Sequence, residues 1–268
     1  MDGEASLSPR LSAPRISVLG ASVDVVTPSE VLAFIDRNAQ PGRRALIANH
    51  NLHSLYLYRR SADMRAFYAR ADLIEADSTP MILWARLLGL PIGPAHRCTY
   101  LDWREDFWRL ASERRWRVFY LGGEPGVAER GAESVKARWP GQHIAVRHGF
   151  FDLDGPQNAQ VVAAVNAFKP HVLLVGMGMP RQEAWLRANL DALHCGVAMP
   201  VGAAFDYEAG AIPTPPRWTG RMGVEWLFRL MAEPRRLVFR YLIEPWTLIG
   251  PAFADLAAGL RRALGPAR

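Results

Sequence analysis

The stretch HVLLVGMGMPRQE, residues 171–183, decides the fold class of this 268-residue chain. Residues 171–175 contain an uninterrupted apolar run, which is typical of a strand buried on both faces. Gly176 and Gly178 then predict a tight turn, and a helix is expected over residues 182–190. A strand that passes through a glycine turn into a helix is the repeating unit of a parallel α/β sheet.

The same alternation continues on both sides of this stretch. Downstream, GVAMPVGAAFD at residues 196–206 again reads as an apolar strand followed by glycine and small residues. We therefore expect a Rossmann-like α/β fold with a mostly parallel, doubly wound sheet and helices on both faces. The other expected strands are 16–19, 23–26, 45–48, 72–76, 117–121 and 144–147; the other expected helices are 29–38 (capped by Ser29), a short one from residue 52, 62–70, 80–89, 101–115, 125–139 and 157–168.

The proline-rich stretch IPTPP, residues 212–216, ends this pattern and sets the predicted domain boundary. The α/β core is expected over 15–212, after a disordered leader at 1–14. Beyond it, 223–232, 235–243 and 248–264 favour helices with no strand between them. An all-helical appendage at 213–268 is too small for a full core of its own. It must pack on the main domain, on a membrane or on a neighbouring subunit, which leaves a homo-oligomer possible.

The net charge of +6 is concentrated in this appendage. From Arg217 onward nine arginines face four acidic residues, and several tryptophans lie among them. A basic, aromatic-rich segment attracts polyanions, either nucleic acid or an anionic membrane face. The alternative is that arginine richness reflects base composition, since Lys136 and Lys169 are the only lysines of the chain.

The compartment is predicted to be reducing. Cys98 and Cys195 are far apart and form no CxxC pattern, so a disulfide framework and a cysteine-based zinc site are improbable. No run of about 18 uncharged apolar residues occurs, and the first residues lack the apolar region of a signal peptide. We expect a cytoplasmic protein.

Polar residues that follow the strands are the first candidates for a site, because such sheets bind ligands at the carboxyl ends of their strands. Gly176 and Gly178 let backbone N–H groups approach an anion beside a helix N-terminus, although a purely structural turn explains them equally well. Arg181 occupies the third glycine position of a dinucleotide fingerprint, so that fingerprint is not met. Arg181 can pair with phosphate, and Gln182 and Glu183 can hold a ribose or a base edge.

Asp77 follows an apolar strand, where burial would raise the pKa of its carboxyl toward the range of a general base. On spacing alone, capping of the next helix is the stronger interpretation of Asp77. Asn49 and Asn51 could bind sugar hydroxyls or cap a helix. Gly202 permits close approach of a ligand and Asp206 could contact hydroxyls, with a packing turn as the alternative.

Two catalytic classes are excluded by spacing. Only His50 and His53 lie close together among the seven histidines, and no carboxylate within one turn completes a metal triad. No GxSxG elbow is present. A metal hydrolase and a serine hydrolase are therefore rejected.

Three linked motifs, in matching order and spacing, resemble the WecG/TagA/CpsF glycosyltransferases over about residues 16–243. They are VGMGMPRQEAW (175–185), VGAAFDYEAG (201–210) and GVEWLFRL (223–230) followed by EPRRL and RYL (233–242). The resemblance implies transfer of a sugar from a nucleotide donor, usually UDP-linked, to a polyprenyl-diphosphate-linked saccharide at the cytoplasmic membrane face. It also implies synthesis of exopolysaccharide, capsule or teichoic-acid-type polymers, an appendage that completes the site at the membrane, and no essential metal or other cofactor.

The chain departs from the family's pattern at four places. It has Ala76-Asp77-Ser78 for Pro-Asp-Gly, Asn49-His50-Asn51 for Thr-x-Asn, Tyr100 for the glycine of Arg-x-Thr-Gly-x-Asp, and Thr214-Pro215-Pro216 for Arg-Ala-Pro. The first of these retains the carboxylate that the resemblance identifies as the base. Since the glycine loop is intact, we expect nucleotide binding to be retained and the choice of sugar or acceptor to have changed.

These observations lead to a prediction of inverting glycosyl transfer. Asp77 would deprotonate the acceptor hydroxyl, with Asn49 and Asn51 beside it. The charge on the leaving diphosphate would be stabilised by backbone N–H groups and by cationic side chains. The candidates for the diphosphate and acceptor are Arg229, Arg236, Arg240 and Thr99. The alternative is a catalytically inactive module that binds a nucleotide sugar or nucleic acid; the helical spacing of the tail's aromatic residues argues against nucleic acid.

Overall fold

The computed structural model describes residues 13–40 and 42–264. Among these residues, six parallel strands form one sheet in the order β4-β3-β8-β7-β5-β6. The strands are β3 (Ala45–His50), β4 (Leu73–Ala76), β5 (Arg117–Gly122), β6 (His143–Arg147), β7 (Val172–Gly176) and β8 (Val197–Pro200). The expected Rossmann-like α/β class is confirmed.

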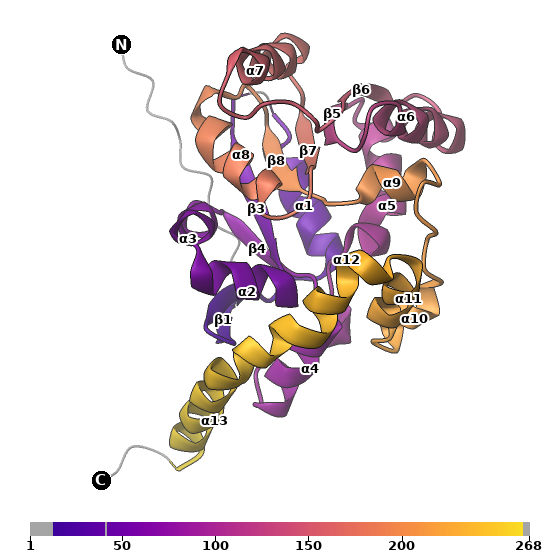
Figure 1. Cartoon of the computed structure of the whole chain (residues 1–268). Coiled ribbons are helices and arrows are strands. Elements are labelled where there is room, and N and C mark those ends of the chain that lie inside the picture. Colours follow the sequence, from indigo (N-terminus) through magenta and orange to yellow (C-terminus); the bar gives the residue numbers. More distant parts are fainter. Residues whose placement is uncertain (1–12, 41, 265–268) are drawn as a thin grey trace, which may run out of the picture.

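Side chains alternate between the two faces of the sheet, as the period of a strand requires. On β3, Leu46 and Ala48 contribute to one buried cluster, whereas Ala45 and Ile47 contribute to the other. The first face is covered by α2 (Leu52–Arg60), α3 (Ala62–Ala69), α7 (Pro156–Phe168) and α8 (Arg181–Asn189); the second is covered by α1 (Pro28–Asn38), α5 (Tyr100–Glu113), α6 (Val127–Arg138) and α9 (Ala204–Glu208). The sheet is therefore enclosed between two layers of helices (Figure 1).

The first two strands form a separate antiparallel hairpin, β1 (Arg15–Val18) and β2 (Ala21–Asp24). Asp24 links this hairpin to the edge of the main sheet, because its Oδ2 accepts a hydrogen bond from the backbone N–H of Ile74 at 2.8 Å. The leader expected at 1–14 falls outside the described residues except for Ala13 and Pro14, and the carbonyl of Pro14 accepts a hydrogen bond from Val25.

The expected cap of the first helix is wrong. The N-cap of α1 is Thr27, whose hydroxyl accepts from the backbone of Glu30 while the Glu30 carboxylate accepts from the backbone of Thr27. Ser29 lies inside the first turn. The proline at position 28 explains the difference, because proline is favoured at the first helical position, which puts the cap at residue 27, two residues earlier than expected.

After residue 216 the described chain forms helices joined by short turns, with no strand among its described residues. The elements are α10 (Arg217–Arg221), α11 (Glu225–Ala232), α12 (Pro234–Val238), the π-helix η3 (Phe239–Ile243), the 3₁₀ helix η4 (Glu244–Leu248) and α13 (Ile249–Leu264). Figure 1 shows α12 to α13 as a nearly continuous run that passes α2 and leads away from the sheet. We call residues 217–264 the appendage.

The appendage packs on the core through buried apolar and polar contacts. Leu237 and Leu248 are buried, and Glu244 pairs with His53 of α2 at 2.6 Å. Asp255 accepts hydrogen bonds from the backbone of Leu19 at 2.7 Å and from the indole of Trp84, on α4 (Thr79–Leu87), at 3.1 Å. None of the helices in the described ranges is long and apolar enough to cross a membrane.

Candidate functional site

Three adjoining cavities lie at the carboxyl ends of the strands, between the sheet and the appendage. The loop cavity, of about 810 Å³, is lined by residues that include Gly176, Gly178, Arg181, Gly202, Asp206 and Arg236. The inner cavity, of about 130 Å³, shares Gly178, Gly202, Ala203 and Arg236 with it. The appendage cavity, of about 340 Å³, shares Asn51, Asp77, Thr99, Glu225, Arg229 and Arg240 with the inner cavity. The shared walls connect the glycine loop to the appendage by way of Asp77.

The two glycine loops are joined by one buried side chain. The amide oxygen of Gln182 accepts hydrogen bonds from the backbone N–H groups of Gly178 and Gly202, each at 3.2 Å. Both glycines have positive φ, +76° and +54°, which side-chain-bearing residues adopt only with strain. The N–H of Gly178 is thus already bonded within the protein, so the expected direct contact between this N–H and an anion is not available in this conformation.

Arg181 and Glu183 also have protein partners. The Arg181 guanidinium donates to the carbonyls of Gly149 and Phe151, at 3.1 Å for Gly149 through Nη2. Glu183 is buried and accepts from Gln182 at 2.8 Å, and burial raises the pKa of its carboxyl to about 7. Arg181 lines the loop cavity, whereas Gln182 lines the inner cavity and joins the two glycine loops, and Glu183 holds the Gln182 amide.

Gly176 is a glycine for packing reasons. A Cβ atom at this position would lie 2.2 Å from the hydroxyl oxygen of Tyr120 and 2.5 Å from the carbonyl oxygen of Gly202. The ends of β5, β7 and β8 can therefore converge only because residue 176 has no side chain. Asp206, in the short helix α9, lines the loop cavity, and burial raises the pKa of its carboxyl.

Asp77 lies directly after β4, on the wall common to the inner and appendage cavities. The capping interpretation is wrong, because the N-cap of α4 is Ser78. Withdrawal from water raises the pKa of the Asp77 carboxyl to about 7, even though the guanidinium of Arg97 acts in the opposite direction. At neutral pH this side chain is therefore poised to accept a proton.

The two asparagines after β3 differ in role. Asn51 caps α2, since its Oδ1 accepts from the backbone of Ser54 at 3.0 Å, and its Nδ2 donates to Asp77 at 3.5 Å. Asn49 caps no helix; its Nδ2 donates to the carbonyl of Pro200 at 3.0 Å. Both line the inner cavity next to Asp77. The structure therefore brings together Asn49, Asn51 and Asp77 as expected.

The appendage arginines converge on these cavities. Arg229 and Arg240 line both cavities beside Asp77, and Arg236 lines the loop and inner cavities. Within the described chain, Nε of Arg229 and of Arg240 is buried without a hydrogen-bond partner. A buried guanidinium with an unused donor is suited to an anionic ligand. Among the described residues, no group of three or more His, Cys, Asp or Glu side chains is arranged to hold a metal ion.

A comparison with models of protein families shows to which family the chain belongs. Residues 16–262 match the model of the glycosyl transferase WecG/TagA/CpsF family. The chain belongs to this family. Its similar proteins include the N-acetylglucosaminyldiphosphoundecaprenol N-acetyl-beta-D-mannosaminyltransferases of Staphylococcus aureus strains NCTC 8325 / PS 47 and COL. Each is 24% identical over 238 residues, which cover 85% of this chain and 89% of the relative. The protein is a glycosyltransferase, which favours an enzyme over a module that only binds.

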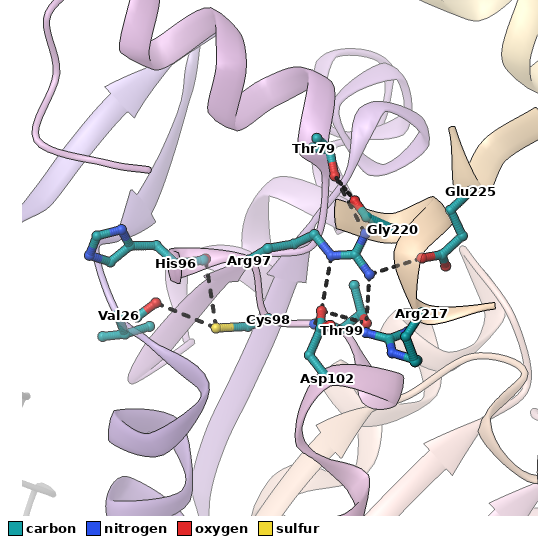
Figure 2. A network of polar contacts seen from close by, with 10 residues as sticks. All are labelled: Val26, Thr79, His96, Arg97, Cys98, Thr99, Asp102, Arg217, Gly220 and Glu225. Atoms are coloured by element: carbon teal, nitrogen blue, oxygen red, sulfur yellow. Dashed lines mark hydrogen bonds and ion pairs between the residues drawn. The ribbon is translucent and has the colours of Figure 1, made fainter. Parts of the chain in front are cut away.

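The appendage of this glycosyltransferase is held to the core by a network around Arg97 (Figure 2). Arg97 donates to Asp102 of α5 and to Glu225 of α11, both at 2.9 Å. Asp102 also pairs with Arg217 of α10 and accepts from the hydroxyl of Thr99 at 2.8 Å. Thr99, predicted to contact the acceptor, thus lines the cavity as part of this network.

Sequence reasoning missed two residues of the glycosyltransferase's inner cavity, Glu75 and Trp103. Both are 1% exposed and line the cavity. The available signal for Glu75 was a carboxylate inside an otherwise apolar strand, LIEA. No sequence pattern distinguished Trp103, because a tryptophan on an amphipathic helix is typical of the hydrophobic core. Tyr100, a departure from the family's pattern, lines the same cavity and donates to Glu208 at 2.9 Å.

Proposed function

We propose that this glycosyltransferase moves a sugar from a UDP-sugar donor onto a saccharide carried by polyprenyl diphosphate, in the synthesis of a cell-surface polysaccharide. The Staphylococcus aureus relatives, by name, transfer N-acetylmannosamine to N-acetylglucosaminyl-diphosphoundecaprenol, a substrate pair of this kind. The observation that carries the proposal is the position of Asp77. It lies where two cavities meet, with a pKa of about 7, within reach of a donor in one cavity and an acceptor in the other.

The donor nucleotide occupies the loop cavity in this proposal, and its sugar extends into the inner cavity. Gly176, Gly178, Gly202 and Asp206 line the nucleotide's path. The diphosphate lies near Arg236, Arg229 and Arg240, of which the last two have unpartnered Nε atoms among the described residues. Cationic donors aimed at the leaving diphosphate stabilise the negative charge that develops on it.

The transfer is a single displacement. The carboxylate of Asp77 removes the proton from the acceptor hydroxyl, and the acceptor oxygen attacks the anomeric carbon of the donor sugar. The new oxygen–carbon bond forms as the bond from that carbon to the phosphate oxygen breaks, and UDP departs with the electron pair. Because attack occurs opposite to the leaving group, the anomeric configuration inverts. Asn51 donates to Asp77 and keeps the carboxylate oriented.

The acceptor enters from a membrane surface through the appendage cavity. The appendage exposes large apolar side chains, including Trp218 (56% exposed), Trp246 (70%) and Phe253 (68%). Six arginines lie between residues 217 and 240. In the proposal these arginines hold the enzyme peripherally at the anionic cytoplasmic face of the membrane, where each basic residue contributes about 1 kcal/mol to the free energy of binding. A polyprenyl-linked acceptor is then delivered beside Asp77.

The test is a transfer assay with the wild-type protein, UDP-N-acetylmannosamine and a short-chain N-acetylglucosaminyl-diphospholipid. We expect release of UDP together with a lipid product heavier by one N-acetylhexosamine, and nuclear magnetic resonance should show an inverted anomeric linkage. UDP-glucose, UDP-galactose and UDP-N-acetylglucosamine are run in parallel. Binding of UDP without sugar transfer from any of these donors would contradict the proposal.

A further inference from the structure

The inner cavity contains polar atoms that the protein itself does not satisfy. Within the described residues, Oδ1 of Asn49, Oε1 of Glu75 and Nε1 of Trp103 are buried without a hydrogen-bond partner. All three residues line this cavity. A buried polar group that lacks a partner is destabilising, because it has lost its hydrogen bonds to water and gained none in exchange. Three such groups around one cavity therefore indicate a polar ligand that bonds to all of them.

The hydrogen-bonding capacity of these atoms can be assigned. The Asn49 amide nitrogen donates to Pro200, so its oxygen is the end available for a ligand, and it can only accept. The indole of Trp103 can only donate. Burial raises the pKa of the Glu75 carboxyl well above its usual value, and the nearby Asp77 and Asp102 act in the same direction. Both effects favour the protonated form of Glu75, whose O–H can donate a hydrogen bond.

The cavity thus presents two donors and one acceptor, next to the apolar side chains of Leu101 and Met199. A secondary amide complements this set, because its carbonyl accepts two hydrogen bonds, its N–H donates one and its methyl group packs on an apolar wall. The volume, about 130 Å³, is several times the ~30 Å³ that a water molecule occupies in the liquid. A hydroxyl group, with one non-hydrogen atom, would leave most of this space empty.

We propose that the inner cavity binds the acylamino group of the donor sugar, with Glu75, Trp103 and Asn49 as its recognition residues. The inference rests on the proposed function, since it takes the loop cavity as the nucleotide site. The sugar that the Staphylococcus aureus relatives transfer is, by name, N-acetylated. The inference deepens the proposed function by assigning recognition of such an N-acetyl group, and the discrimination against plain hexoses, to three named side chains. Each of them binds substrate and takes no part in proton transfer.

Calorimetric titration of the full chain tests this selectivity. Two matched pairs of probes are compared: UDP-N-acetylmannosamine with UDP-mannose, and UDP-N-acetylglucosamine with UDP-glucose. Wild type should bind the N-acetyl member of at least one pair about tenfold more tightly. Glu75→Leu and Trp103→Phe should each remove most of this preference, with the affinity for UDP alone unchanged. Glu75→Gln, which keeps an N–H donor, should retain it.

Trp185→Phe is the matched control. Trp185 is as buried as Trp103, but its indole already donates to Asn158 at 2.7 Å and it does not line the inner cavity. This variant should keep the wild-type preference. Should Glu75→Leu fail to fold, Trp103→Phe and Glu75→Gln decide the question between them.

The outcomes separate the two proposals. If wild type binds UDP but shows no preference within either pair, or if Trp103→Phe keeps the full preference, the inference about the inner cavity is overturned and the proposed function stands. If wild type binds neither UDP nor any UDP-sugar, the proposed function itself fails.

Discussion

Asp77 and Glu75 are two residues apart, yet their surroundings suit them to different tasks. Burial raises the pKa of both carboxyls. Arg97 and Arg229 oppose this effect at Asp77 and hold its pKa at about 7, whereas the neighbouring charges at Glu75 are negative and raise its pKa further. Asp77 can therefore exchange a proton at neutral pH, whereas the surroundings of Glu75 favour its protonated form. At the scale of single residues, local charge decides which carboxyl can act as a base.

Replacement of the proposed base tests its role. We expect Asp77→Asn to lower kcat by roughly 10²–10⁴-fold, the usual contribution of a general base. Affinity for UDP, measured by calorimetry, should stay within about twofold of wild type, since Asp77 does not line the loop cavity. Asp106→Asn, at an exposed surface ion pair, is the control and should be fully active. Near-normal kcat in the Asp77→Asn variant would exclude Asp77 as the base.

The pH dependence follows from the same carboxyl. A general base must be deprotonated to act, so activity is lost as the pH falls through its pKa of about 7. We expect kcat/KM to fall about tenfold for each pH unit below 7 and to level off above it. Residual activity of Asp77→Asn should lack this step. A profile that is flat from pH 5 to 8 would contradict the assignment.

At the scale of elements, two strand-to-helix loops act as one unit because Gln182 bonds to both. The glycines at the ends of β7 and β8 have positive φ, and the buried amide of Gln182 ties them together. The loop cavity opens beside this joint. The loop geometry is therefore set before any ligand binds, and ligand contact depends on the space in front of the glycines.

Gly178→Val tests whether that space receives the diphosphate. A Cβ atom at Gly178 meets no heavy atom within 4 Å, so a valine side chain would extend into open space beside the loop and inner cavities. We expect at least a tenfold loss of UDP affinity by calorimetry. Gly89→Val is the matched control: its φ of +71° and open surroundings are similar, but it lies in no wall of the three cavities. Equal losses in both variants would indicate backbone strain alone.

At the scale of the whole molecule, the site exists only because the appendage lies over the core. Arg97 joins the two parts through Asp102 and Glu225, and its side chain is 11% exposed. Gly220 of α10 fits directly against it, since a Cβ there would lie 2.5 Å from the guanidinium. Breaking a buried ion pair by removing one partner costs about 3–5 kcal/mol, because the remaining charge is left buried.

Arg97→Leu should therefore release the appendage. We expect faster hydrogen exchange over residues 217–248, unchanged exchange in β7 and β8, and a loss of transfer activity of at least tenfold. UDP should also bind more weakly, because Arg229, Arg236 and Arg240 would move away with the appendage. The control Arg114→Leu removes a partly exposed ion pair with Asp36 that joins two elements of the α/β core. It should change none of these properties, because such ion pairs contribute about 1 kcal/mol or less to stability. Unaltered exchange in the appendage of Arg97→Leu would show that apolar packing alone holds it.

The proposed membrane association also belongs to the scale of the whole molecule, because it would depend on the exposed face of the appendage. The double variant Trp246→Glu, Phe253→Glu changes two highly exposed side chains and should leave the fold intact. We expect it to lose most binding to vesicles rich in anionic phospholipid in a sedimentation assay. Phe150→Glu, which is 64% exposed beside the loop cavity, should bind as wild type. Wild-type binding should weaken at 1 M salt, where the Debye length is roughly 3 Å; binding that survives both changes would exclude this face.

The sequence by itself determined the α/β class, the position of the glycine loops and the helical nature of the appendage. Each of these follows from local patterns: apolar runs of strand length, glycines after strands, and helical periodicity beyond the prolines at 213–216. Asn49, Asn51 and Asp77 could be placed near one another from the sequence, because the carboxyl ends of parallel strands meet at one edge of a sheet.

Only the tertiary structure decided what these residues do. The expected contact of Gln182 and Glu183 with a nucleotide stays a prediction, but the structure adds that the Gln182 amide joins the two glycine loops and that Glu183 accepts a hydrogen bond from it. The spacing of Asp77 favoured a helix-capping role. Its raised pKa could not be predicted, because it depends on burial and on Arg97 and Arg229, which lie 20 or more positions away in the chain. Glu75 and Trp103 were not anticipated at all. Burial, long-range charge and unsatisfied hydrogen bonds arise from how distant segments pack, and local sequence patterns do not contain that information.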